Sequence, residues 1–359
     1  MNVLQSISTR RFLGILILLC TITTWKGNAQ DFTDLIIPES PLILRAQGSF
    51  YSGGEVQSQS FDELGSFGPG QSISVNQMYV RYMIPQTVEG VYPIVMIHGM
   101  ALTGKTWETT PDGRMGWDEY FVRQGYPVYV VDQVARGRSG FNQRLLNRVR
   151  TGIDAPQQLA PARRFSDEFV WRNFRIGMEK DQPFDITLYP VDYLDEFSKQ
   201  GVPDLSGYIS DYGPNYSALS ELASNLEGAI LMSHSQSGFF PMEVALLNQN
   251  NVTGIIAVEP GACATSLNEE QLRILAQMST LIVFGDYLEV PTGIDHSWKV
   301  ACEQCETYAS QVNGVGGNVK VIKLAESGIK GNSHMLMQDT NHIELADSII
   351  QWVKDNIKK

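Results

Sequence analysis

Residues 228–238 have the sequence GAILMSHSQSG, in which a mostly apolar run leads directly into a turn made of Ser, His and Gly. A continuous apolar run of this length is typical of a strand that is buried on both faces of a sheet. Residues 240–247 are largely apolar and follow at once with a helical pattern. The stretch therefore predicts a buried strand, a sharp turn and a helix, with Ser235 in the turn.

Ser235 is the serine of this turn that suits a nucleophile. A nucleophile on a sharp strand-turn-helix connection needs small residues two positions before and two positions after it. For Ser235 these neighbours are Ser233 and Ser237, whereas the other two serines would bring Leu231 or Phe239 into the crowded place. We therefore predict Ser235 as the nucleophile, although serine replaces both glycines of the common Gly-x-Ser-x-Gly pattern.

Apolar runs on both sides of this stretch alternate with helical patterns. This order predicts a mainly parallel sheet with helices on both faces, in one domain over residues 30–359. The expected strands are 49–57, 73–84, 93–98, 127–132, 228–233, 254–258, 280–284 and 319–324, and the expected helices include 117–125, 297–312 and 343–357.

Residues 141–213 depart from this alternation and are rich in Arg, Asp, Pro and aromatic residues. A connection of roughly 75 residues is too long for a plain loop. We predict an inserted cap over the strand ends; a separate interaction module is the alternative. Four arginines of this segment are expected to be solvated, although they could meet an anionic group: Arg163, Arg164, Arg172 and Arg175.

Residues 1–29 contain the three parts of a signal peptide. Arg10 and Arg11 precede an apolar run over 12–25, and the small residues Gly27 and Ala29 precede a cleavage site between Ala29 and Gln30. The run is too short to span a membrane comfortably, so we expect cleavage and no stable membrane insertion afterwards. This predicts a secreted or periplasmic protein, with an uncleaved anchor as the alternative.

Cleavage at this position removes three positive charges and no negative one, so the net charge changes from −12 to −15. A protein this acidic repels phosphate backbones, so nucleic acid is not an expected partner. The mature chain keeps Cys263, Cys302 and Cys305, which permits one disulfide in an exported protein. We favour Cys263–Cys302 as a stabilising bridge, and Cys263–Cys305 is the alternative.

The sequence HGMALTG at 98–104 follows the expected strand 93–98 and predicts an oxyanion loop. Acyl transfer places negative charge on the former carbonyl oxygen, and two backbone N–H groups must point at that charge. We predict the N–H groups of Met100 and Gln236 as these donors. His98 is interpreted as a buried support, and the DQVARGRSG sequence at 132–140 as the floor of the site.

The general base is expected after the last strand, where His334 and His342 are candidates. His334 is preferred, because Asn341 suggests that His342 merely begins the closing helix. For the acid, the usual place after strand 280–284 is taken by Leu288, so Glu259 is preferred. Asp286 and Glu289 are the alternatives. No histidine spacing typical of a metal site is present, and no metal or cofactor is expected.

Five sequences together resemble the α/β-hydrolase superfamily, and more narrowly a group of exported bacterial carboxylesterases: HGMALTGKTW, DQVARGRSG, SHSQSG, VEPG and GNSHMLMQD. The resemblance covers about residues 73–357. It implies an α/β-hydrolase fold in which the acid is a glutamate after the sixth strand and the base is the His of Ser-His-Met. Carried onto this chain, these are Glu259 and His334, with Ser235 as nucleophile and Met100 and Gln236 as oxyanion donors.

The sequence thus predicts a serine esterase that hydrolyses small carboxylic esters through an acyl-enzyme on Ser235. Two alternatives stay open. The same residues could transfer the acyl group to another alcohol or open a lactone, or the chain could be a binding protein on a hydrolase scaffold without activity. The sequence is silent on the acyl and alcohol preference and on the oligomeric state.

Overall fold

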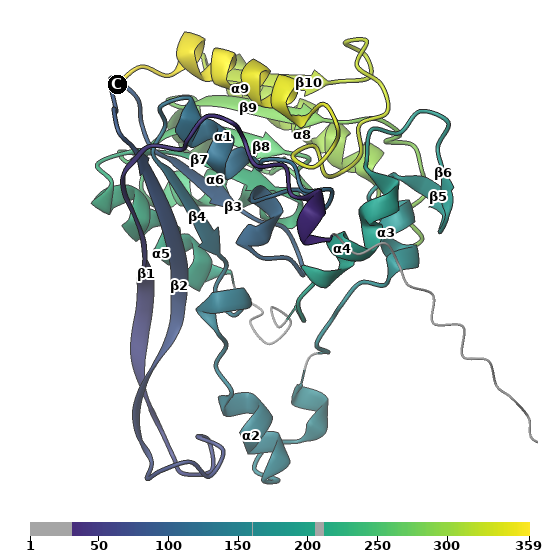
Figure 1. Cartoon of the computed structure of the whole chain (residues 1–359). Helices are drawn as coiled ribbons and strands as arrows, with labels where there is room; N and C mark the ends of the chain where they lie inside the picture. Colours follow the sequence, from purple (N-terminus) through teal and green to yellow (C-terminus); the bar gives the residue numbers. More distant parts are fainter. Residues whose placement is uncertain (1–30, 160, 205–211) are drawn as a thin grey trace, which may run out of the picture.

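A computed structural model describes residues 31–159, 161–204 and 212–359 (Figure 1). The predicted signal peptide, residues 1–29, lies outside these ranges, and so do residues 205–211 of the predicted cap. Within the described ranges, no helix has the length and apolar character needed to cross a bilayer.

An eight-stranded sheet with the order β1-β2-β4-β3-β7-β8-β9-β10 forms the centre of the molecule. β1 pairs antiparallel with β2 and β2 antiparallel with β4, while the remaining neighbours pair in parallel. The expected mainly parallel sheet is confirmed. Its strands are β1 (Leu44–Gln59), β2 (Gln71–Pro85), β3 (Ile94–Ile97), β4 (Val128–Asp132), β7 (Ala229–His234), β8 (Val252–Val258), β9 (Ser279–Phe284) and β10 (Asn318–Lys323).

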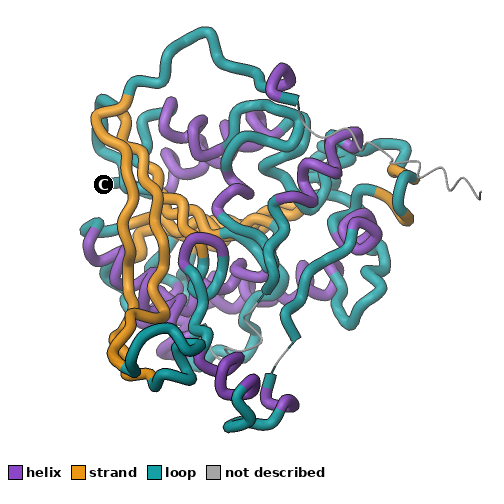
Figure 2. Tube along the Cα trace, turned by 60° about the horizontal axis from the view of Figure 1, so that its bottom comes forward, coloured by secondary structure: helices purple, strands orange, loops and turns teal. Residues whose placement is uncertain are grey.

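Helices cover both faces of this sheet, as Figure 2 shows. Alternate residues of the central strands point to opposite faces, so Ile94 and Met96 pack with α1 (Trp117–Arg123) and α9 (His342–Asn356). Val95 and Ile97 pack instead with the helices of the second core. The helices of this second core are α5 (Gly213–Asn225), α6 (Phe240–Leu247), α7 (Glu269–Leu275) and α8 (Trp298–Gly314).

The first two strands are longer than the sequence pattern predicts, and they form a hairpin that extends beyond the sheet (Figure 1). The hairpin is anchored on α5, where the Ser52 hydroxyl donates to the Ala218 carbonyl oxygen at 2.8 Å. Near the turn, Glu63 pairs with Arg144 and Arg148 of α2 (Arg144–Arg150). Polar contacts therefore hold α2 against the end of the hairpin.

The segment between β4 and α5 contains, besides α2, the helices α3 (Asp167–Asn173) and α4 (Leu194–Lys199) and the short strands β5 (Gly177–Glu179) and β6 (Gln182–Pro183). Its aromatic side chains do not stand apart from the main body. Trp171, Phe174 and Phe197 belong to the same buried cluster as α1 and α9. Burial of these aromatic side chains therefore stabilises the packing of this segment against one face of the sheet.

The disulfide joins Cys263 to Cys305, so the favoured pairing of Cys263 with Cys302 is wrong. Cys302 and Cys305 lie one turn apart on the same face of α8, and both side chains are buried. Their spacing along the helix does not indicate which of the two cysteines lies next to Cys263. The packing of α8 against the sheet places Cys305 with its Cα 4.9 Å from that of Cys263 and leaves Cys302 as a buried thiol.

The bridged cysteine Cys263 and the free cysteine Cys302 should therefore differ in their effect on stability. Replacing Cys263 with serine opens a link across 42 residues and is expected to lower the free energy of unfolding by about 2–4 kcal/mol. Replacing Cys302 with serine leaves the link intact and should cost about 1 kcal/mol. Urea unfolding of both variants measures the difference, and a larger loss for Cys302→Ser would contradict the pairing.

Candidate active site

Ser235 begins a single 3-10 turn (Ser235–Phe239) between the end of β7 and the start of α6. Its φ is 59°, in the left-handed region that side-chain-bearing residues rarely occupy. Such local strain is typical of residues that the surrounding structure holds in a functional position. Ser235 follows the last residue of β7 and lines a cavity there.

The two serines that replace glycine in the usual pattern hold this turn by hydrogen bonds. The buried Ser237 hydroxyl lies 3.1 Å from the Ile97 carbonyl oxygen and 3.0 Å from that of His234, and it accepts from the His234 backbone N–H at 3.2 Å. The Ser233 hydroxyl makes a longer contact of 3.4 Å with the Gly238 carbonyl oxygen. Small polar residues therefore take the place of small apolar ones without crowding the turn.

His334 and Glu259 contact each other near the end of β7. The His334 Nδ1 atom is 3.0 Å from a Glu259 side-chain oxygen, Oε2, and both side chains are fully buried. His334 Nε2 is buried and has no hydrogen-bond partner among the described residues. Ring contacts hold the imidazole, with its centroid 4.1 Å from that of Trp298 and 4.6 Å from that of His234.

Backbone contacts connect the glutamate to the serine turn. Glu259 also has a left-handed φ, of 51°, and follows β8 directly. Its second oxygen, Oε1, accepts from the Gly285 backbone N–H at the end of β9. Two residues further along, the Gly261 N–H donates to the Ser235 carbonyl oxygen at 2.8 Å. The carboxylate is thus fixed between two adjacent strand ends.

The alternative site residues lie in other surroundings. His342 contacts the Met115 carbonyl oxygen through Nε2 at 2.9 Å and Arg114 through Nδ1. The Asp286 carboxylate accepts from the backbone N–H groups of Tyr287 and Gly331, at 2.7 and 2.9 Å. Glu289 is exposed and pairs with Lys299 at 3.0 Å. Of the candidate acids, Glu259 is the one that contacts His334.

The loop after β3 passes very close to Ser235. His98 stabilises this loop through two hydrogen bonds. Its Nδ1–H donates to the Gly99 carbonyl oxygen at 2.8 Å, and its Nε2 accepts from the Gln133 N–H at 2.9 Å. Burial lowers the pKa of His98 to about 4, so the ring is neutral in this role. Asp132 accepts from the Gly104 N–H at 2.7 Å and so fixes the far end of the loop.

Gly99 is needed at the point of closest approach. A Cβ atom at this position would lie 2.8 Å from the Ser235 Cβ and 3.3 Å from the His234 carbonyl oxygen. Gly99→Ala should therefore displace the loop from Ser235 and lower kcat about tenfold to a hundredfold, because small misplacements at a reacting centre are costly. Gly314→Ala is a matched control, since nothing lies within 4 Å of the added atom. An unchanged kcat in Gly99→Ala would contradict this geometry.

A buried polar network supports Gln236. Arg136 forms a bidentate pair with Asp204 at 2.8 Å, and both side chains are almost completely buried. The same guanidinium donates to the Gln236 side-chain oxygen at 3.1 Å and to Gln133. Because Gln133 also contacts His98, the network joins the two loops that carry the predicted oxyanion donors.

A cavity of about 300 Å³ opens beside Ser235. Met100 and Gln236 line it together with Ser235, so the structure brings these three predicted residues to one place. The rest of the lining is mainly apolar and comes largely from the segment after β4 and from the residues before α8: Leu102, Phe165, Phe169, Phe174, Phe239, Ile294 and Trp298, with Asn173 and His296 as polar members.

The expectation of a solvated side chain, made for four arginines within residues 141–213, is wrong for Arg175. Its side chain is fully buried, and its Nη2 atom lies 2.6 Å from Glu259 Oε2. The sequence contained one indication of this position, because Arg175 stands between Phe174 and Ile176, which are both buried. Tertiary contacts far along the chain decide that the charge meets a carboxylate rather than water.

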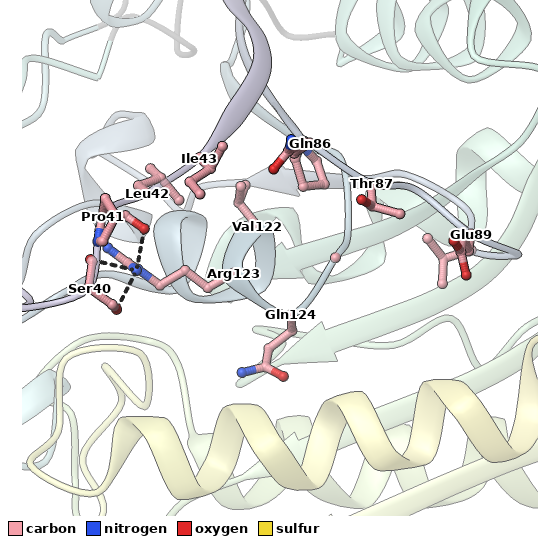
Figure 3. A pocket seen from close by; sticks show the side chains of 13 residues that line it. Ser40, Pro41, Leu42, Ile43, Gln86, Thr87, Glu89, Val122, Arg123 and Gln124 are labelled. Carbon is pink, nitrogen blue, oxygen red and sulfur yellow. Dashed lines mark hydrogen bonds between the residues drawn. The ribbon is translucent and has the colours of Figure 1, made fainter.

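A larger hollow of about 670 Å³ lies between the segment before β1 and α1 (Figure 3). Arg123 is directed toward Ser40 and Pro41 there, donating to the Ser40 side-chain and backbone oxygens at 3.1 Å. No serine–histidine–acid arrangement occurs among its lining residues. Within the described parts of the chain, no three His, Cys, Asp or Glu side chains are grouped as metal ligands would be.

Comparison with known proteins finds relatives that cover most of this chain. No family model matches the sequence. The chain is 40% identical to a bacterial esterase of known atomic-resolution structure, with a TM-score of 0.82 over 89% of this chain and 99% of that one. It is also 26% identical to a probable secreted lipase from a fungal species, over 90% of this chain and 99% of the fungal protein.

Proposed function

This chain belongs to the α/β-hydrolase superfamily and is a carboxylic ester hydrolase, and we propose that it cleaves esters through an acyl-enzyme on Ser235. The observation that carries this proposal is the His334–Glu259 contact of 3.0 Å, with His334 Nε2 unpartnered among the described residues. The His334 ring lies 4.6 Å from that of His234, the residue before Ser235. Such an imidazole has one nitrogen oriented by an acid and the other available to a nucleophile.

In the first half of the reaction, the Ser235 hydroxyl oxygen attacks the ester carbonyl carbon while His334 Nε2 accepts the hydroxyl proton. Glu259 keeps the Nδ1–H tautomer of His334 and stabilises the imidazolium that forms. The backbone N–H groups of Met100 and Gln236 bind the developing oxyanion, each contributing about 3 kcal/mol. Collapse of the intermediate expels the alcohol, which takes the proton from His334.

In the second half, water attacks the acyl-enzyme and His334 acts again as base and then as acid. The carboxylic acid leaves and the Ser235 hydroxyl is restored. Transfer of the acyl group to a different alcohol, or the opening of a lactone, would use the same residues and the same intermediate. Hydrolysis is favoured as the proposal because the solved structure that is 40% identical to this chain is that of an esterase.

Product partitioning tests the acyl-enzyme directly. Three esters with the same acyl group and different leaving groups are hydrolysed in the presence of methanol, and the ratio of acid to methyl ester is measured. A common acyl-enzyme predicts the same ratio for all three esters. A ratio that changes with the leaving group would exclude the common intermediate, and methyl ester as the dominant product would identify an acyltransferase.

The cavity beside Ser235 supports an apolar group on the substrate. Its volume of about 300 Å³ and its aromatic lining fit an acyl or alcohol group of moderate size. We propose that residues 141–213 act as a cap that supplies much of this lining. Among p-nitrophenyl esters of increasing acyl length, kcat/KM is expected to rise from acetate to a medium-length chain and then fall. A continuous decline from acetate onward would argue against acyl binding in this cavity.

Export is the final part of the proposal. The disulfide between Cys263 and Cys305 fits an oxidising compartment, and the fungal relative is a probable secreted protein. We propose cleavage of residues 1–29 and a secreted or periplasmic mature enzyme. The N-terminal residue of the mature protein, determined by mass spectrometry, should be Gln30; retention of Met1 in the exported fraction would contradict cleavage.

A further inference from the structure

Arg175 brings a permanent positive charge to the carboxylate that contacts His334. It lies just after α3 with a left-handed φ of 56°, and its side chain is fully buried. The carbonyl oxygen of the preceding residue, Phe174, accepts from the His334 backbone N–H at 2.8 Å. One short turn of the segment after β4 therefore contacts both the candidate acid and the candidate base.

Several contacts hold the Arg175 guanidinium in place. Nη2 lies 2.6 Å from Glu259 Oε2, in a close ion pair whose angle departs from that of a hydrogen bond. Nε donates to the Asp286 carbonyl oxygen at 2.7 Å. The guanidinium carbon lies 5.1 Å from the centroid of the Trp298 ring, the same ring that contacts His334. A buried charge requires such partners, and Glu259 is the anionic partner of Arg175.

Glu259 Oε2 is consequently shared by two groups. It lies 2.6 Å from the guanidinium and 3.0 Å from His334 Nδ1, so a protonated His334 would stand within about 6 Å of a permanent cation. In a triad without such a cation, the charge of the acid favours the imidazolium. In this chain the arginine offsets that charge while leaving the carboxylate in position to accept from Nδ1–H.

We propose that Arg175 is a positioning residue that fixes the Glu259 carboxylate and keeps His334 neutral, so that the esterase remains active at lower pH. This inference rests on the proposed roles of Ser235, His334 and Glu259. A general base works in its neutral form, and its activity is lost as the pH falls through its pKa. Removing the arginine should therefore move the acid limb of the pH profile upward.

The other groups around His334 agree with this direction. Burial, followed by the charges of Arg175 and His296, holds the pKa of His334 well below its ordinary value. His234 faces His334 from the end of β7, and burial together with His334 lowers its own pKa well below the ordinary value. Its Nε2–H donates to the His334 carbonyl oxygen at 3.0 Å.

The acidic groups on this side are engaged elsewhere. Asp286, after β9, accepts from two backbone N–H groups. Asp339 accepts from the backbone N–H and the hydroxyl of Ser333, at 2.9 and 2.6 Å, and burial raises its pKa to about 6. Glu259 is thus the carboxylate in direct contact with the His334 ring, and Arg175 is its counter-ion.

The test is the pH dependence of kcat/KM for Arg175→Met, Arg175→Lys and the wild type. In Arg175→Met the midpoint of the acid limb should rise by about one pH unit or more, as expected for removal of a charge within about 6 Å. Arg175→Lys keeps the charge and should restore most of the wild-type midpoint. Arg172→Met, which removes an arginine that donates to the Met178 carbonyl oxygen, should leave the midpoint unchanged.

An unchanged acid limb in Arg175→Met would overturn the inference, as would an equal shift in Arg172→Met. Titration of the His334 imidazole nitrogens by NMR in the wild-type enzyme needs no variant. A midpoint below the ordinary value of about 6.5 supports the inference, and one at or above it would overturn it. Labelling of Ser235 by a fluorophosphonate at pH 8 tests the nucleophile separately from the role of Arg175. If Arg175→Met is labelled on Ser235 and keeps the wild-type pH profile, only the role of Arg175 is refuted.

Discussion

Replacing Ser235 with alanine is expected to lower kcat by about a millionfold while the fold is retained. In the proposed mechanism the hydroxyl oxygen forms the acyl-enzyme, and loss of the nucleophile in serine hydrolases has an effect of this size. Ser235 lines the cavity and its side chain is not part of the packed core, so its removal opens no void in that core. Steady-state hydrolysis of a p-nitrophenyl ester measures kcat, and thermal unfolding checks the fold.

Ser233→Ala is the matched control for this variant. Ser233 lies two residues earlier, near the end of β7, and among the described residues its hydroxyl makes the 3.4 Å contact with the Gly238 carbonyl oxygen. Its loss should cost about 1 kcal/mol of stability or less and leave kcat within about tenfold of the wild type. A Ser235→Ala enzyme that keeps more than about one hundredth of the activity would show that a different residue is the nucleophile.

Replacing Glu259 with glutamine is expected to lower kcat by about ten thousandfold. Glutamine has nearly the same shape, but its neutral amide no longer secures the Nδ1–H tautomer of His334 or stabilises the imidazolium. The change also leaves the buried Arg175 without its counter-ion, so the free energy of unfolding should fall by several kcal/mol. Measurement of kcat well below the unfolding temperature separates the two effects.

Asp286→Asn distinguishes Asp286 from Glu259 as the candidate acid. The Asp286 carboxylate accepts from backbone N–H groups, and an asparagine side chain still offers one oxygen acceptor there. We expect kcat to stay within about tenfold of the wild type. A large loss in Asp286→Asn together with a small one in Glu259→Gln would reverse the assignment of the acid.

Local patterns in the sequence were sufficient to predict the sheet, the helices and the turn at Ser235. The alternation of apolar runs and helical patterns predicted the parallel strands because a strand buried on both faces must be apolar throughout. The small neighbours of Ser235 predicted the sharp turn because sterics at that turn depend on residues close in sequence. The structure adds the reason why serine is acceptable there, namely the hydrogen bonds of Ser237.

Contacts between distant segments could not be predicted in the same way. Cys302 and Cys305 share one face of a helix, and only the packing of α8 selects Cys305 as the partner of Cys263. Arg175 lies more than eighty residues from Glu259 in the sequence. The surrounding segment is rich in Arg, Asp and Pro, which suggested a solvated arginine. Its burial follows from a tertiary contact with Glu259, the residue directly after β8.

Ser235 is the proposed nucleophile of this ester hydrolase. The most direct measurement is the intact mass of the purified enzyme after treatment with a fluorophosphonate, followed by peptide mapping. We predict one label per chain, located on Ser235, with loss of activity in proportion to labelling and no label on Ser235→Ala. An active enzyme whose mass stays unchanged, or whose single label lies on another residue, would show that Ser235 is not the nucleophile.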